Sequence, residues 1–135
     1  MTDFEQATLF FQIIDTAHSA VANFLTVVFA VVAVSYFVAE RLDRSVSLLL
    51  LGVYSLFCIG MIREIFYLYS DMARLGHAMA QEPSDAFAWL NIAQNSVNNP
   101  ETVIPYSVLT MTGLAFAGSL LFFYRMRRSA RAETS

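Results

Sequence analysis

The sequence predicts an all-α membrane protein with three transmembrane helices. Its composition, its apolar runs and the placement of its arginines support this prediction. Of the 135 residues, 57% are hydrophobic and only 14% are charged, and the mean hydropathy is +0.55. A soluble domain carries roughly 25% charged residues. A chain of this length forms about one domain, so residues 1–135 are treated as a single membrane domain.

Three apolar runs are long enough to cross about 30 Å of hydrocarbon, which takes roughly 20 helical residues. They cover residues 20–39, 45–69 and 104–124. Each is expected to be an α-helix, because an open strand in lipid would leave backbone groups without hydrogen bonds. An outer N-terminal helical leader, residues 1–19, precedes the first span, and an inner turn, residues 40–44, joins the first two spans.

The arginines predict the orientation of these helices. Arg41 and Arg44 lie in the inner turn, and four more arginines follow the third span in the tail, residues 125–135. On the other side Arg74 is the lone arginine, among several acidic residues. Under the positive-inside rule the N-terminus lies outside and the basic tail is cytoplasmic. The expected location is therefore the inner (plasma) membrane of the cell, crossed three times.

The outer loop, residues 70–103, is long for a membrane hairpin and is expected to hold a short amphipathic helix. Apolar residues share one face of the stretch "SDAFAWLNIAQNSV", and Trp89 stands there as an interfacial anchor would. The following "NNPET" has the pattern of a helix start. Asn99 would cap the helix, Pro100 fits its first turn, and Glu101 lies near the positive end of the helix dipole.

One charged pair, Arg63 and Glu64, interrupts the second span. Arg63 lies about six residues below the outer end of this span, or roughly 9 Å at 1.5 Å per residue. Ionisable residues inside a membrane are costly and usually face protein or water. Counting outward from the inner turn places Asn23 of the first span and two threonines of the third span at a similar depth. The sequence therefore predicts an intramembrane polar cluster of Asn23, Arg63, Glu64, Thr110 and Thr112.

Three interpretations of the charged pair stay open. It is part of a structural or interfacial cluster, it contains an arginine that snorkels to the headgroups, or it lines an ion, proton or ligand path. Snorkelling has a geometric difficulty, because helical side chains lean toward the helix N-terminus, which is here the cytoplasmic side. Adjacent residues point about 100° apart, so Arg63 and Glu64 cannot reach one neighbour. One is expected to bond within the protomer and the other across a subunit interface.

Small residues predict close helix packing and self-association. In "TMTGLAFAGS", Gly113 and Ala117 form a small-xxx-small pair that Gly118 flanks, and Gly52 and Gly60 lie in the second span. Such faces let helix backbones approach closely in a membrane. Besides the lipid bilayer, the expected partner is therefore another copy of the chain or a different membrane subunit.

No catalytic constellation, phosphate-binding loop or metal motif is visible, so neither an enzyme nor a cofactor nor a metal site is expected. Nothing in the charge pattern indicates nucleic acid. His18 and His77 both lie on the outer side, where they could approach one another as haem or metal ligands, although surface histidines are the more ordinary explanation. Cys58 is the single cysteine, so no intrachain disulfide forms.

Three functions remain open at this point. The first is a non-enzymatic membrane protein that self-assembles into an oligomer and encloses an ion or solute pathway, lined or gated by Asn23, Arg63, Glu64 and Thr110. The second is an accessory or anchor subunit of a larger membrane complex, a redox complex among them. The third is a structural scaffold without transport.

Overall fold

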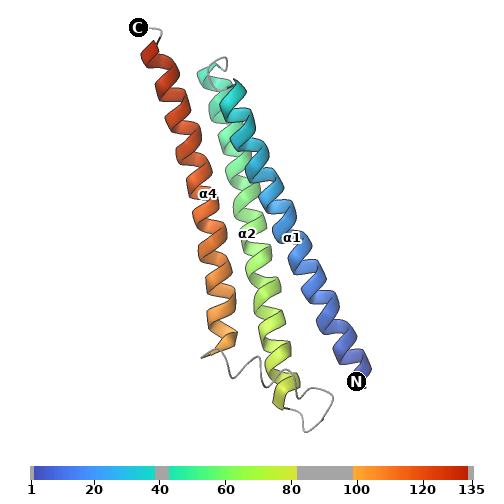
Figure 1. The fold of residues 1–135 in the computed structure, drawn as a ribbon. Coiled ribbons are helices and arrows are strands. Elements are labelled where there is room, and N and C mark those ends of the chain that lie inside the picture. Colours follow the sequence, from blue (N-terminus) through green and yellow to red (C-terminus); the bar gives the residue numbers. More distant parts are fainter. Residues whose placement is uncertain (1, 39–42, 82–98, 134–135) are drawn as a thin grey trace.

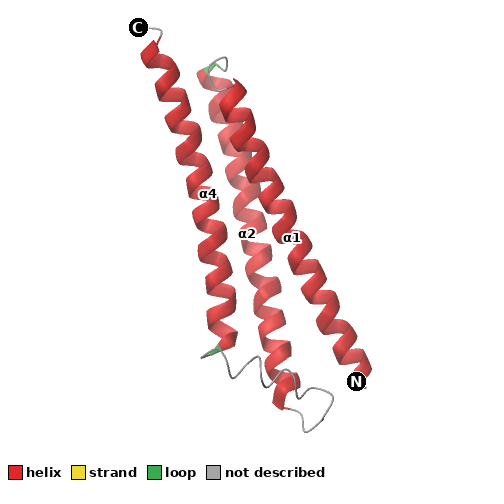
Figure 2. Cartoon of the chain, in the orientation of Figure 1, coloured by secondary structure: helices red, strands yellow, loops and turns green. Residues whose placement is uncertain are grey.

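The structure is a computed structural model that describes residues 2–38, 43–81 and 99–133, and these residues form three long α-helices. Figure 2 shows these ranges as helix, apart from short loop pieces before α2 and α4, with no strand among them. The bounds of the helices are Asp3–Val38 for α1, Arg44–Gln81 for α2 and Pro100–Glu133 for α4. The short amphipathic helix expected around Trp89 lies outside the described residues.

The three helices run side by side, with neighbours along the chain antiparallel (Figure 1). Each helix contacts the other two. The end of α1, the start of α2 and the end of α4 lie together, and we call this the arginine end because it carries Arg44, Arg125, Arg127 and Arg128. The opposite end, called the acidic end, carries Asp3, Glu5, Asp71 and Glu101.

All three helices are long and apolar enough to cross a membrane. With 36, 38 and 34 residues, they are roughly 50–57 Å long at 1.5 Å per residue. A hydrocarbon core is about 30 Å thick, so each helix is longer than a single crossing needs. The prediction of an all-helical fold with three such helices is confirmed.

Helix α2 continues as far as Gln81, well beyond the predicted end of the second span at residue 69. This extension buries Ala73 and Met79, and Met79 packs in a small cluster with Phe10 of α1. Hydropathy detected only the part of α2 that is apolar on all sides. The remainder is an amphipathic helix, whose stability depends on one buried stripe.

Helix α1 begins with a side-chain cap, whereas α4 begins with backbone hydrogen bonds to Asn99. Glu5 accepts a hydrogen bond from the Thr2 backbone N–H (2.8 Å), and the Thr2 hydroxyl accepts one from the Glu5 N–H (3.3 Å), which is a capping box. At α4, the carbonyl of Asn99 accepts hydrogen bonds from the backbone N–H groups of Thr102 and Val103. Asn99 has φ of 54°, a left-handed conformation that asparagine tolerates better than most residues.

Buried side chains recur every seven residues and join the helices. In α1 these are Phe10, Ala17 and Phe24, and in α4 they are Pro105, Thr112 and Ser119. A repeat of seven keeps one stripe of each helix facing its neighbours, as in left-handed helical bundles. The core between the helices is mainly apolar, and its most buried members include Phe24, Cys58 and Ile65.

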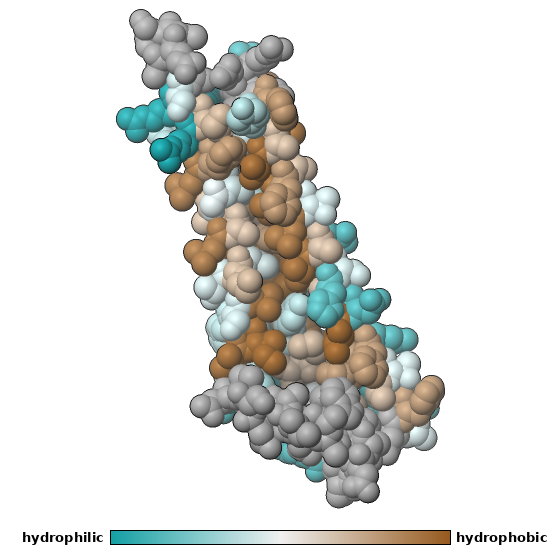
Figure 3. Space-filling view, viewed as in Figure 1, coloured by the Kyte–Doolittle hydropathy of each residue, from teal (hydrophilic) through white to brown (hydrophobic). Residues whose placement is uncertain are grey.

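Most of the apolar surface nevertheless faces outward. Only 17–22% of the residues in the most hydrophobic window of each helix are buried. Leu49, Leu56, Met111 and Leu121 are all about 70% exposed or more. Figure 3 shows hydrophobic side chains along most of the visible face, with hydrophilic ones at the arginine end and in the lower half. The bundle therefore has the outward-facing apolar surface that a lipid environment accommodates.

Candidate functional site

Arg63 lies on the outer flank of α2 beside α4. Its guanidinium carbon is 5.5 Å from the centroid of the Tyr67 ring, a distance at which a cation–π interaction stabilises by about 0.5–2 kcal/mol. Tyr67 is one turn further toward the acidic end, so α2 itself supplies the aromatic ring that lies beside the guanidinium group.

An open groove of about 320 Å³ contains this arginine. Its walls come from α2 and from Leu109 of α4, and its lining comprises Ile59, Ile62, Arg63, Phe66, Tyr67 and Leu109. Phe66 also meets Tyr106 of α4 edge to face, with ring centroids 5.6 Å apart. Arg63 is thus surrounded by aromatic and aliphatic groups, with one aromatic face available to its charge.

Glu64 points elsewhere on the exposed surface of α2. Within the described residues it has no ion pair and no side-chain hydrogen bond. Glu64 directly precedes Ile65, which is buried, and it is seven residues beyond Phe57, a residue that lines an apolar groove between α1 and α2. Residues seven apart share a helix face, so Glu64 lies on the α1 side of α2, whereas Arg63 lies on the α4 side.

The other three members of the predicted polar cluster are not gathered around this pair. Asn23 is exposed on α1, next to the fully buried Phe24. Thr110 is exposed and donates its hydroxyl to the carbonyl of Tyr106 (2.8 Å), while Thr112 is buried and donates to the carbonyl of Val108 (2.8 Å). Both threonine hydroxyls are therefore bonded within α4.

The polar residues differ in the face of the bundle on which they lie more than in their position along it. Because Leu109 shares a groove with Arg63, the neighbouring Thr110 lies within about one helical turn of Arg63 along the bundle. The threonine and the arginine flank the same α2–α4 surface. Asn23 and Glu64 belong to the α1–α2 side, and Thr112 lies between the helices. One protomer thus presents two lateral polar positions instead of one closed cluster.

The glycines expected to bring helices together face open space within the protomer. A Cβ atom added to Gly52, Gly60, Gly113 or Gly118 would meet no atom within 4 Å. Ala117 and Gly118 are exposed, and Gly113 is half-buried. These small residues do not form the contacts among α1, α2 and α4, and they leave shallow positions on the outer surface.

A buried polar contact that the sequence analysis did not identify joins α2 and α4. The Tyr54 hydroxyl lies 2.7 Å from the Ser119 hydroxyl, and Ser119 donates to the carbonyl of Phe116 (2.7 Å). Since Ser119 has one hydroxyl proton, Tyr54 is the donor in the first bond. The spacing of Ser119, seven residues after Thr112, was a usable signal that it faces the neighbouring helices.

Within the described residues, a contact between a histidine and a carboxylate links α2 and α4 at the acidic end. His77 Nε2 lies 3.8 Å from Glu101 Oε1 and 2.8 Å from Gln81 Nε2. His18 is exposed on α1. Over the three described ranges, no group of three or more His, Cys, Asp or Glu residues is placed to hold a metal ion. Trp89, expected as an interfacial anchor, lies outside those ranges.

No protein-family model, curated protein or solved structure matches this chain.

Proposed function

We propose that this chain is a small, non-enzymatic integral membrane protein that self-assembles through its lateral surfaces. The observation that carries the proposal is the exposed pair Arg63–Glu64 in the apolar part of α2. A charge inside hydrocarbon costs about 2.5–3.5 kcal/mol at the bilayer centre and less near its edge. A neighbouring subunit that pairs with these charges removes much of this cost.

A second copy of the chain is the partner that the pair fits best, because it is self-complementary. One subunit offers a base on the α4 side of α2 and an acid on the α1 side. Arg63 of one copy can therefore meet Glu64 of the next. The open positions at Gly52, Gly60 and Gly113 support the same proposal, since small residues allow neighbouring helices to approach.

We place the N-terminus outside and the arginine end in the cytoplasm, in the inner membrane, from the arginine distribution. A solute pathway, if the oligomer encloses one, lies between protomers. The interior of a single bundle is filled by side chains such as Phe24, Cys58 and Ile65, which are at most 1% exposed. Asn23, Arg63, Glu64 and Thr110 are the polar residues available to line such a path.

The test exploits the charge complementarity of the pair. In Glu64→Arg both positions are basic, and in Arg63→Glu both are acidic. Each variant expressed alone should no longer show the mass of the oligomer in mild detergent, because residues of like charge would meet at the subunit contact. When the two variants are co-expressed with different tags, the oligomer mass should return. Pull-down through one tag should then recover the other variant. Arg74→Gln, an exposed arginine further along α2, serves as the control and should leave the mass unchanged.

Other outcomes favour the alternative functions. A wild-type chain that is monomeric or polydisperse would contradict self-assembly and favour an accessory subunit of a larger complex. A defined oligomer that conducts no ions in planar bilayers would favour a scaffold. If the oligomer conducts, Arg63→Gln should alter the flux while preserving assembly.

A further inference from the structure

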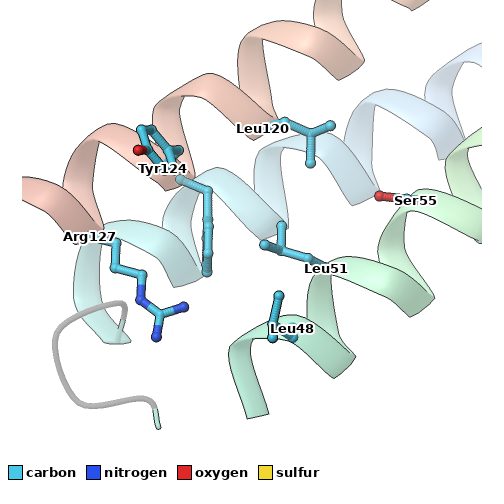
Figure 4. A pocket seen from close by; sticks show the side chains of 7 residues that line it. Leu48, Leu51, Ser55, Leu120, Tyr124 and Arg127 are labelled. Atoms are coloured by element: carbon cyan, nitrogen blue, oxygen red, sulfur yellow. The ribbon is translucent and has the colours of Figure 1, made fainter. Parts of the chain in front are cut away.

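A second groove lies between α2 and α4 near the arginine end, away from the Arg63–Glu64 pair. It has a volume of about 580 Å³ and is open to the surface, within the range of 300–1,000 Å³ typical of small-molecule sites. Its lining residues are Leu48, Leu51, Ser55, Leu120, Phe123, Tyr124 and Arg127. Figure 4 shows Arg127 at one end of the groove and Ser55 at the other, with the leucines between them.

The chemistry of this groove is divided between its ends. The walls are aliphatic and aromatic, whereas Arg127 supplies a guanidinium group at the end nearer the arginine end of the bundle. Arg127 makes no ion pair with any residue in the described parts of the chain. Arg125 and Arg128, both exposed, add positive charge around it. A ligand that fits must therefore combine an apolar tail with an anionic group.

The dimensions of the groove agree with an acyl chain. From Leu48 to Ser55 the wall of α2 extends for roughly 10 Å at 1.5 Å per residue. One leaflet of a bilayer contributes about 15 Å of hydrocarbon, so the groove covers about two thirds of a leaflet.

We propose that the groove binds an anionic membrane phospholipid, with an acyl chain between α2 and α4 and the phosphate against the guanidinium of Arg127. Arginine recognises phosphate through two parallel hydrogen bonds, and basic pockets between transmembrane helices are known to hold anionic headgroups. The proposal depends on the proposed function only in that the chain must span a bilayer. It requires neither an oligomer nor a pathway.

The experiment counts lipids bound to the full-length chain by native mass spectrometry after delipidation. Dioleoyl phosphatidylglycerol, which is anionic, is compared with dioleoyl phosphatidylcholine, which has the same chains and no net charge. Wild type should retain the anionic lipid in preference. Arg127→Gln should weaken its binding about fivefold, which corresponds to about 1 kcal/mol for one arginine near a membrane surface. The control variant Arg128→Gln changes a neighbouring residue that does not line the groove, and it should still prefer the anionic lipid.

A second pair of variants tests the apolar part of the site. Leu48→Trp projects a large ring into the groove and should lower binding of both lipids. Leu56→Trp, at a position that is 75% exposed and lines none of the grooves described above, should not. Helicity by circular dichroism confirms that each variant is folded. Excess inorganic phosphate should not displace the lipid, because it satisfies only the arginine.

Three results would overturn the lipid site. The first is equal binding of the two lipids by wild type. The second is an equal loss of binding of the anionic lipid in Arg127→Gln and Arg128→Gln. The third is unchanged lipid binding in both Arg127→Gln and Leu48→Trp. A different measurement would contradict the proposed function. If alkaline carbonate extracts the chain from membranes, the chain is not an integral membrane protein. A chain that lacks only the lipid site would stay in the membrane.

Discussion

Tyr54 lies in the first third of α2 and is almost fully buried against α4. Its hydroxyl is 2.7 Å from that of Ser119, and its ring is 5.7 Å from the ring of Phe116, centroid to centroid. A tyrosine at this depth must satisfy its hydroxyl within the protein, since lipid offers no partner. The two contacts together fix α4 against α2 at one register.

Replacing Tyr54 with phenylalanine removes the hydroxyl and keeps the ring. The variant should lose about 0.6 kcal/mol of unfolding free energy, the average for a hydrogen bond between membrane helices. Denaturation by dodecyl sulfate in mild detergent, followed by circular dichroism, measures this loss. Tyr36→Phe is the matched control, because Tyr36 is 62% exposed. An equal loss of unfolding free energy in Tyr54→Phe and Tyr36→Phe would mean that the buried hydrogen bond does not stabilise the protein more than an exposed hydroxyl does.

Single residues also show why counting along the sequence estimates the depth of a polar side chain but not the direction in which it faces. Asn23 precedes Phe24, and Glu64 precedes Ile65, and in each pair the second residue is buried. Because neighbours on a helix point about 100° apart, burial of the second residue directs the polar one away from the core. Counting residues from a turn gives distance along a helix. The face that points inward depends on packing between helices.

At the scale of the elements, the sequence was sufficient to predict the three helices because each contains a long apolar run. It did not predict the length of α2 beyond residue 69, where hydropathy falls and the burial of Ala73, Gly76 and Met79 marks the inward stripe. The small residues of α4, which predict close helix packing and self-association, do not mark the face that α4 turns toward α1 and α2. In α4 the inward face carries Pro105, Thr112 and Ser119, while Gly118 faces outward.

Two adjacent substitutions in α4 should therefore have opposite consequences. Ser119→Leu inserts extra volume beside Tyr54 and should cost about 1–3 kcal/mol of unfolding free energy, as overpacking does. Gly118→Leu meets open space and should keep or improve helix stability, since glycine is about 1 kcal/mol worse than alanine in a helix. Thermal unfolding in detergent compares the two variants. If Gly118→Leu were as harmful as Ser119→Leu, the assigned inward face of α4 would be wrong.

The same pair of variants separates folding from assembly. Should the outer face of α4 contact another protomer, Gly118→Leu would reduce the oligomer mass while the monomer stays folded. Size-exclusion chromatography with light scattering provides this second measurement.

At the scale of the whole molecule, apolar side chains cover the outside of the bundle as well as its core, unlike those of a water-soluble bundle. The core is narrow, and long apolar side chains such as Leu56 and Met111 face outward. In water such a surface would aggregate, whereas lipid tails are as apolar as leucine and give no driving force to hide it. Contacts between helices must then depend on packing and on polar links such as Tyr54–Ser119.

The proposed orientation of the molecule rests on the concentration of arginines at one end, and cysteine labelling tests it. Cys58 is fully buried, so replacing it with alanine gives a background without a reactive thiol. In that background, Glu5→Cys reports the acidic end and Ser129→Cys reports the arginine end. A membrane-impermeant maleimide should label Glu5→Cys in intact cells and should label Ser129→Cys only after lysis, because the positive-inside rule places the arginine end in the cytoplasm.

Leu56→Cys, which faces outward in the apolar part of α2, should stay unlabelled in both conditions. The reverse pattern at the two ends would invert the topology, and labelling of Leu56→Cys in intact cells would mean that this face of α2 is in water.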